Sequence, residues 1–310
     1  VQGRNATVIR AQSAAIDLIE IDQPGVRIGR KGRGFTLRGA TGGGSAGINV
    51  DAANVRIEGN RITANNQGIN ADTGEKIQIR HNDVDDNMAI GIACYGCERG
   101  MIQDNRVYSN NLAGIHVGLG ADRAQIRRNL VRDNGHRGIS ADEFSLQIVV
   151  RDNAVYRNGY AISDGGIELQ DVAGATVQGN ISTDNYSYGI IAVQFEPGTL
   201  TMRHNLVTAA NVDAFRLVSL QAARLENNTA MQALSDGFEM TGSANFASLK
   251  NNNSIGSGSC GIRNSTALPL AYGKHFFSGN GLTVCGGGGY GNTSEAARLN
   301  KTNVNQARNL

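Results

Sequence analysis

Four side chains capable of acid–base chemistry stand at matching places after a recurring Gly-Ile pair. His116 and Glu168 directly follow such a pair, in "GIH" and "GIE", and Tyr95 and Asp142 come two residues later, in "GIACY" and "GISAD". An imidazole can accept a proton near neutral pH, a phenol can donate one, and two carboxyl groups can serve as the acid and base of a hydrolysis. Their shared spacing predicts that one repeated structural unit brings them together.

The repeat extends through most of the chain. An asparagine recurs three residues after an apolar strand position, at steps of 22 to 28 residues. These asparagines are Asn60, Asn82, Asn105, Asn129, Asn153, Asn180, Asn205, Asn228, Asn252 and Asn280. A second column precedes the next strand and consists of Gly47, Gly68, Gly91, Gly114, Gly138, Gly166, Gly189, Ala214, Gly237 and Gly261. Periods of 20 to 50 residues are typical of solenoids, propellers and other repeat arrays.

The content of one period selects among these architectures. Each period holds two or three short runs with β-branched residues at alternate places, as in "VRIEGNRIT", separated by Gly and Asn. No segment has the sustained 3.6-residue pattern of a helical repeat, and a propeller blade needs about 40 to 45 residues. We therefore predict an all-β parallel β-helix of ten to twelve coils. The asparagines are expected to stack in one turn as a hydrogen-bonded ladder, and the glycines to supply positive φ.

The chain is expected to form a single domain over residues 1–310. Residues 1–33 are predicted to form irregular N-terminal coils, with strands in "TVIRAQ" and "IDLIEI", and residues 286–310 a C-terminal tail or cap. With 29 basic and 27 acidic residues the net charge is +2, which argues against a nucleic-acid partner. No run approaches the roughly 18 apolar residues of a membrane span, so no membrane insertion is expected.

The four cysteines indicate the compartment. Cys260 and Cys285 lie 25 residues apart, about one coil, which predicts a disulfide between them. Cys94 and Cys97 form "CYGC", which leaves open a local disulfide, a redox pair or half of a metal site. An even count on a repetitive β scaffold favours an oxidising location, so we expect a periplasmic or secreted protein.

The "apolar-x-x-Asn … Gly-Ile" phrasing, kept from about Gly34 to Asn280, resembles the right-handed parallel β-helix repeat of pectate-lyase-like proteins. That superfamily includes alginate lyases and epimerases and NosD-like periplasmic proteins. The resemblance implies a right-handed solenoid whose substrate groove lies on the outer face of the strand after each glycine. Strand alternation then predicts one outward column, with a second two residues further on. The first column is Asn49, Asn70, Ala93, His116, Ser140, Glu168, Ile191, Arg216, Glu239 and Arg263.

The resemblance also implies a polysaccharide substrate. Elimination in a uronic-acid polymer needs a base for the C5 proton, an acid for the leaving oxygen and a cation for the carboxylate. We assign His116 as the base, Tyr95 as the acid and Arg137 or Arg216 as the cation. Returning the proton from the opposite face would make the protein a C5-epimerase. The alternatives are a glycoside hydrolase that uses Asp142 with Glu168, and a noncatalytic carbohydrate-binding or structural β-helix such as a tailspike, an adhesin or a NosD-like protein.

Further residues are expected to bind the substrate. Tyr160 lies in the insertion "NGYAISDGG" before the strand of Glu168, and solenoid insertions often lie on the binding face. The full set of predicted binding residues is Asn70, Asp72, Arg137, Tyr160, Gln170 and Arg216.

Some motifs of the relatives are absent, and no cofactor is required by the pattern. The Asp-Pro-His-Asp signature of alginate epimerases is missing, because His116 sits in "GIHVG". A hard cation such as Ca²⁺ remains an option if four carboxyl groups converge. Those carboxyl groups belong to Asp142, Glu143, Glu168 and Asp171. His81 and His204, which each precede a ladder asparagine, are interpreted as solvent-facing strand residues.

Overall fold

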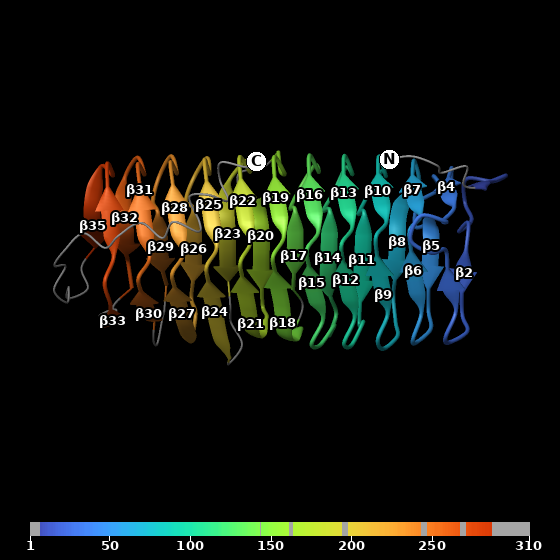
Figure 1. Cartoon of the computed structure of the whole chain (residues 1–310), viewed down its shortest axis with the longest axis horizontal. Helices are drawn as coiled ribbons and strands as arrows, with labels where there is room; N and C mark the ends of the chain where they lie inside the picture. The colour runs from blue at the N-terminus through green and yellow to red at the C-terminus, as the bar shows by residue number, and fades with distance from the viewer. Residues whose placement is uncertain are drawn as a thin grey trace.

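The computed structural model describes residues 7–142, 144–160, 164–193, 198–242, 247–266 and 271–286. Within these residues all regular secondary structure is β-strand, and every strand pairing is parallel. Successive strands enter three different sheets in turn, so the chain winds into a solenoid of about eleven turns. Figure 1 shows the strands of each sheet side by side along the long axis. The parallel β-helix predicted from the repeat is confirmed, whereas the predicted C-terminal tail beyond residue 286 lies outside the described residues.

The three sheets, A, B and C, are named here in chain order. Sheet A contains β1 (Val8–Arg10), β4 (Thr36–Arg38), β7 (Arg61–Thr63), β10 (Asp83–Asp85), β13 (Arg106–Tyr108), β16 (Leu130–Arg132), β19 (Ala154–Tyr156), β22 (Ile181–Thr183), β25 (Leu206–Thr208), β28 (Thr229–Met231), β31 (Asn253–Ile255) and β34 (Phe276–Ser278). Sheet B contains β2 (Glu20–Ile21), β5 (Ala46–Val50), β8 (Gln67–Ala71), β11 (Ile92–Tyr95), β14 (Ile115–Gly118), β17 (Ile139–Ala141), β20 (Gly165–Gln170), β23 (Tyr188–Val193), β26 (Phe215–Val218), β29 (Phe238–Thr241), β32 (Cys260–Asn264) and β35 (Leu282–Gly286). Sheet C contains β3 (Arg27–Ile28), β6 (Arg56–Glu58), β9 (Gln78–Arg80), β12 (Met101–Gln103), β15 (Gln125–Arg127), β18 (Leu146–Arg151), β21 (Ala173–Gln178), β24 (Thr199–Arg203), β27 (Ala222–Glu226), β30 (Ala247–Lys250) and β33 (Ala271–Tyr272).

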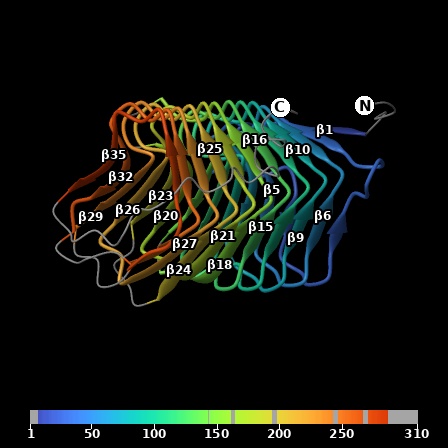
Figure 2. The ribbon, with the colours of Figure 1, turned by 60° about the vertical axis from the view of Figure 1, so that its left-hand side comes forward.

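The interior consists of stacks of identical or similar apolar side chains. Ile69, Ile92, Ile115 and Ile139 stand opposite one another in successive sheet B strands, and each is fully buried. Figure 2 shows the coils lying behind one another with similar outlines, which is the arrangement that such stacks require. Burying one aliphatic side chain stabilises the fold by about 1.5–3 kcal/mol. The repeated apolar position therefore fixes the register of every coil.

An asparagine ladder occupies the turn between sheets C and A, as predicted. The backbone N–H of Asn82 donates to Oδ1 of Asn105 at 3.0 Å, and the N–H of Asn105 donates to Oδ1 of Asn129 at the same distance. The ladder ends differently from the prediction, because the N–H of Asn252 donates to Nδ1 of His275 at 3.2 Å. Placing Asn280 in this ladder was therefore wrong. An imidazole nitrogen thus takes the place of the amide oxygen in the last rung, where it also lies 3.2 Å from the carbonyl oxygen of Asn252.

A second asparagine ladder, which was not predicted, occupies the turn between sheets A and B. Its buried members are Asn65, Asn87, Asn110, Asn134, Asn158 and Asn185. Asn280 belongs to this column, where its Oδ1 accepts the N–H of Ser257 at 2.9 Å. Between Asn185 and Ser257 the column holds Ala210 and Ala233. This interruption hides the second ladder in the sequence.

The glycines before the sheet B strands are required by space rather than by φ. A Cβ on Gly91 would lie 2.7 Å from Nδ2 of Asn110, from Cγ1 of Val107 and from the carbonyl oxygen of Gly114. None of the repeat glycines has a positive φ, so that prediction was wrong. Ala214 is tolerated because the next coil has Ala230 and Ala233 where other coils have larger side chains.

Positive φ occurs instead at the residue before each ladder asparagine, mostly in residues other than glycine. His81 and His204 have φ values of 55° and 54°. They are turn residues in the left-handed region, so interpreting them as strand residues was wrong. The hydrogen bonds of the two ladders offset the cost of this conformation in each coil.

Both cysteine pairs are disulfide-bonded. The Cα atoms of Cys260 and Cys285 are 6.0 Å apart, which confirms the predicted bridge. Cys94 and Cys97 are also joined, with Cα atoms 5.6 Å apart, so the local disulfide is the alternative that the structure adopts. The described residues include no helix with the length and apolar character needed to span a membrane.

Candidate functional site

The candidate site lies on the outer face of sheet B. His116, Ser140 and Glu168 stand in register on β14, β17 and β20, as the predicted outward column requires. Tyr95 is paired with Gly118, which has no side chain, and its ring centroid lies 5.2 Å from that of His116 at an interplanar angle of 58°. The phenol and the imidazole of adjacent coils are therefore in direct contact.

Both nitrogens of His116 face side chains of the next coil. Nδ1 lies 2.8 Å from Oγ of Ser140, and Nε2 lies 3.5 Å from Oδ1 of Asp142. The His116 side chain is only 12% exposed and that of Asp142 16%. Because a hydroxyl can donate or accept, Ser140 can bond either neutral tautomer, and Nε2 carries the lone pair when Oγ accepts from Nδ1–H.

The Asp142 carboxyl is easier to protonate than an ordinary aspartate. Burial raises the pKa of Asp142 to about 6; the charge of Arg137 lowers it and that of Asp171 raises it. A pKa near 6 lies in the range in which imidazoles commonly titrate. The Asp142 carboxyl can therefore exchange a proton near neutral pH while it lies 3.5 Å from Nε2 of His116.

Arg137 and Glu168 form an ion pair beside this contact. Nε of Arg137 lies 2.6 Å from Oε2 of Glu168, whose side chain is 8% exposed. Burial raises the pKa of Glu168, while the charge and the hydrogen bond of Arg137 lower it. Arg137 precedes Gly138 at the start of its coil, so its guanidinium reaches across to the carboxylate of the following coil. The charge of Arg137 thus favours the ionised form of two carboxyl groups, Glu168 and Asp142.

A cavity of about 840 Å³ opens beside Glu168 and extends toward the C-terminal coils. Apolar side chains of Ile191 and Val193 belong to its lining, and Tyr160 and Tyr186, which are 73% and 45% exposed, also face it. The complete lining is Arg137, Tyr160, Glu168, Gln170, Tyr186, Tyr188, Ile191, Val193, Arg216 and Val218. An open cavity with tyrosine rings and two guanidinium groups suits a sugar chain that carries carboxylates.

The predicted site residues fall into three groups. Tyr95, His116 and Asp142 form the contact cluster, which Arg137 and Glu168 connect to the cavity. Tyr160, Gln170 and Arg216 line the cavity itself. Arg216 stands four sheet B strands from His116, so Arg137 is the cation next to the cluster.

Asn70 and Asp72 lie on the same face but outside the cavity. Asn70 is on β8, two strands from the strand of His116, and its Nδ2 donates to Oδ1 of Asn49 at 2.9 Å. Asp72 is exposed in the turn after β8. Both residues could contact a sugar chain only if it continued past His116 toward the N-terminus.

Several polar residues of this face were not predicted. Tyr188, Asp213 and Asp236 occupy the place of Arg137 in later coils, immediately before the repeat glycine or its alanine substitute. Reading that position as a third column would have found them. Ser140 stood in the predicted column, but its role on the His116 ring depends on a side-chain contact that only the structure shows.

The calcium option remains an untested prediction. The described residues contain no group of three or more His, Cys, Asp or Glu side chains suitably placed for a metal ion. Glu143, one of the four predicted carboxyl residues, lies outside the described residues. The Glu168 carboxylate is already bound by Arg137.

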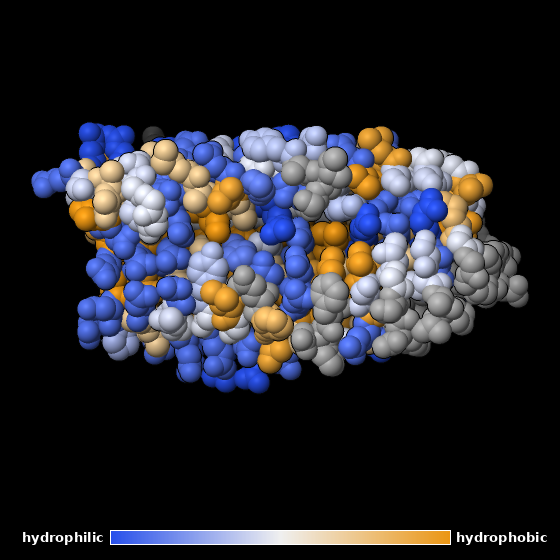
Figure 3. Space-filling view, turned by 180° about the vertical axis from the view of Figure 1, so that it is seen from behind, coloured by the Kyte–Doolittle hydropathy of each residue, from blue (hydrophilic) through white to orange (hydrophobic). Residues whose placement is uncertain are grey.

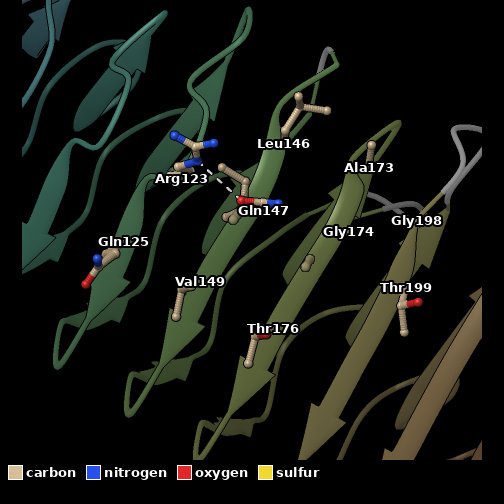
Figure 4. A pocket seen from close by; sticks show the side chains of 12 residues that line it. Arg123, Gln125, Leu146, Gln147, Val149, Ala173, Gly174, Thr176, Gly198 and Thr199 are labelled. Atoms are coloured by element: carbon tan, nitrogen blue, oxygen red, sulfur yellow. Dashed lines mark hydrogen bonds between the residues drawn. The ribbon is translucent and has the colours of Figure 1, made fainter.

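A second cavity, of about 700 Å³, lies on sheet C and is chemically different. Figure 4 shows Arg123 bonded to Gln147 at its edge, with Thr176 and Val149 on neighbouring strands. Its lining has no carboxyl, imidazole or aromatic group. Figure 3 shows a largely hydrophilic face on which hydrophobic residues form separate patches. Of these two cavities, only the one on sheet B is lined by carboxyl and phenol groups.

Comparison with known proteins identifies the fold. The family model described as "Right handed beta helix region" matches residues 24–163, 67–229 and 162–269. No curated protein matches the sequence.

Three solved structures illustrate the likeness. The catalytic unit of the GH87 alpha-1,3-glucanase from Streptomyces thermodiastaticus is 14% identical, with a TM-score of 0.64, over 95% of this chain and 71% of that one. The A-module of the mannuronan C-5 epimerase AlgE4 from Azotobacter vinelandii is 15% identical, with a TM-score of 0.58, over 95% and 82%. The pectate lyase Pel9A is 15% identical, with a TM-score of 0.52, over 95% and 82%. At these identities the likeness establishes the fold, including its hand, and leaves the reaction open.

Proposed function

The chain belongs to the right-handed beta helix family, and we propose that the sheet B face of its solenoid processes a uronic-acid-containing polysaccharide by elimination or C5-epimerisation. The observation that carries this proposal is the contact of His116 with Tyr95, Ser140 and Asp142, beside the Arg137–Glu168 pair and the cavity. The site offers a base, an acid and a cation, which are the three groups that proton removal next to a carboxylate needs.

His116 is proposed to remove the C5 proton. If Ser140 accepts a hydrogen bond from Nδ1–H, then Nε2 carries the lone pair and acts as the base. The proton that Nε2 accepts can pass to Asp142, whose carboxyl lies 3.5 Å away and whose pKa is about 6. Burial of both groups keeps this exchange out of bulk water.

Arg137 is proposed to bind the substrate carboxylate. Its guanidinium contacts Glu168 through Nε, and a guanidinium has further N–H groups that can bind a second carboxylate. Neutralising the substrate carboxylate stabilises the negative charge that develops when the neighbouring C5 proton leaves. Tyr95 then donates a proton to the leaving oxygen in elimination, or to C5 from the opposite face in epimerisation.

The relatives agree with a polysaccharide substrate. By their titles they include a mannuronan C-5 epimerase, a pectate lyase and an alpha-1,3-glucanase. The two disulfides fit a protein that acts in an oxidising compartment, so we place it in the periplasm or outside the cell.

Turnover of defined polymers tests the proposal. Polymannuronate, polygalacturonate and glucuronan are incubated with the protein in deuterated water, and unsaturated uronates, reducing ends and deuterium at C5 are measured. Elimination gives unsaturated ends, and epimerisation gives deuterium without cleavage. Release of reducing ends alone, or no change in any uronate polymer, would contradict the proposal.

Hydrolysis remains the second candidate because of one specific observation. Asp142 has the raised pKa of a general acid, and Glu168 in the next coil is paired with Arg137. Two carboxyl groups in different environments can divide the acid and base roles of a glycosidase. In that case Asp142→Asn and Glu168→Gln would abolish cleavage, and His116→Ala would only weaken it.

A further inference from the structure

The cavity continues well beyond the acid–base cluster. Arg216 lines its far end and stands four coils from His116, which corresponds to about 19 Å at the usual strand spacing of about 4.8 Å. A polymer that lies along the solenoid would therefore place a different sugar unit at each end of the cavity. The two guanidinium groups of the lining, Arg137 and Arg216, are three coils apart.

Arg216 is held in place by three groups. Its Nη1 donates to the hydroxyl of Tyr188 at 2.6 Å, and its guanidinium lies 4.9 Å from the centroid of the same ring. Oδ2 of Asp213 is 3.7 Å from Nη1, and Oε2 of Glu239 is 3.4 Å from Nε. The side chain of Arg216 nevertheless remains 29% exposed. A fixed and partly exposed guanidinium can bind an incoming carboxylate with little loss of entropy.

We propose that Tyr186, Tyr188 and Arg216 form a separate recognition subsite, which binds the carboxylate of a uronate unit several sugars away from the reacting one and is switched by protonation of Glu239. This subsite rests on the proposed function for its substrate class. In this subsite the tyrosine rings and Ile191 contact the faces of the sugar, and the guanidinium of Arg216 binds its carboxylate.

The protonation state of Glu239 determines the net charge around Arg216, where the sugar carboxylate would bind. Oε2 of Glu239 is buried and, among the described residues, is contacted by Nε of Arg216 at 3.4 Å without forming a hydrogen bond. The charged or titratable groups around it are Tyr188, Asp213, Arg216, Asp236 and Arg263. With Glu239 ionised, three carboxylates outnumber two guanidiniums. With Glu239 protonated, the two signs balance and Arg216 has one competing carboxylate fewer.

The titration of Glu239 falls in an accessible range. Burial raises the pKa of Glu239 to about 7, and the hydrogen bond and charge of Asp213 act in the same direction, while Arg216 opposes them. Below this pH the carboxyl is neutral, so the subsite attracts an anionic sugar. Above it the ionised carboxyl competes for Arg216 and repels the substrate.

Binding rather than turnover tests the subsite. Calorimetric titrations use uronate octamers, in the mannuronate and galacturonate series, and their carboxyl-reduced neutral counterparts. The protein carries His116→Ala, so that no substrate is consumed. Arg216→Gln is expected to weaken octamer binding by about 10- to 100-fold, the usual scale for losing a charged hydrogen bond, without weakening the neutral counterpart. The matched control is Arg224→Gln, an exposed arginine on β27 in the same turn of the solenoid but on sheet C.

Glu239→Gln supplies an independent test, because it keeps the shape of the side chain and removes its charge. The octamer affinity of the parent is expected to fall as the pH rises from 6 to 8, and that of Glu239→Gln to stay high across the range. Equal losses for charged and neutral octamers in Arg216→Gln, or an unchanged pH dependence in Glu239→Gln, would overturn the subsite. Octamer binding that follows these rules in a protein that turns over no polymer would leave the subsite standing and contradict the proposed reaction.

Discussion

The outer faces of sheets B and C are built from the same repeat, yet they present different chemistry. Both have cavities of similar size, about 840 and 700 Å³. The sheet B cavity adjoins buried carboxyl groups, an imidazole and tyrosine rings. The lining of the sheet C cavity is uncharged apart from Arg123, which is bonded to Gln147.

The difference shows that scaffold and site are separable in this molecule. The coil interior requires Ile and Val in register, whereas outward positions carry no such requirement. Neighbouring coils bring outward side chains within reach of one another on every sheet. On sheet B this proximity places buried titratable groups beside a cavity, and burial is what moves the pKa values of Asp142 and Glu239.

The largest expected effect is on turnover, from His116→Ala. Removing the base should reduce the rate on a uronate polymer by roughly 10²- to 10⁴-fold, the usual contribution of a general base. The melting temperature should change little, because the side chain lies outside the solenoid core. His204→Asn is the matched control, since His204 is an exposed histidine with a left-handed φ that asparagine accepts. If the two variants turn over the polymer at equal rates, His116 has no catalytic role and the sheet B face is not distinguished from the remaining surface.

Arg137→Gln should reduce both activity and stability. It leaves Glu168, whose side chain is 8% exposed, without its cation, at a cost of about 1–3 kcal/mol. Urea denaturation measures this loss, and Arg137→Gln combined with Glu168→Gln should recover most of it. If the double variant is as unstable as the single one, the pair does not act as an ion pair.

The pH dependence of stability should report the burial of Asp142. Its pKa is about 6 in the folded protein and about 3.9 when unfolded, so the folded state binds more protons between these values. Stability therefore falls as the pH rises from 4 to 6, and the penalty is fully present above pH 6. Asp142→Asn should remove this part of the slope, on the order of 1–2 kcal/mol after allowing for solvent screening. Parallel stability curves for the two proteins would contradict a buried carboxyl.

The smallest effect is expected on sheet C. Gln125→Ala changes an outward residue of the sheet C cavity and should alter unfolding free energy by less than about 0.5 kcal/mol. The rate on a uronate polymer should equal that of the unaltered protein. A clear loss of turnover would mean that the sheet C cavity takes part in the reaction.

Much of the fold could be predicted because aligning the repeats in the sequence also aligns the strands of neighbouring coils. Once Asn105 and Asn129 are aligned, alternation fixes which residues point outward, and the pairing of His116 with Ser140 and of Ser140 with Glu168 follows. The Cys260–Cys285 bridge follows from the same period. The second ladder could not be recognised as easily, because Ala210 and Ala233 interrupt it.

The solenoid, its register and the face on which acid–base side chains gather could be predicted from the sequence, since these depend on periodic burial along one chain. Which of those side chains touch, and how they titrate, is visible only in the folded protein. Three contacts join residues of different coils: Arg137 with Glu168, Ser140 with the His116 ring, and Arg216 with the buried Glu239. Such contacts depend on rotamers and local desolvation, which vary from coil to coil while the repeat stays the same.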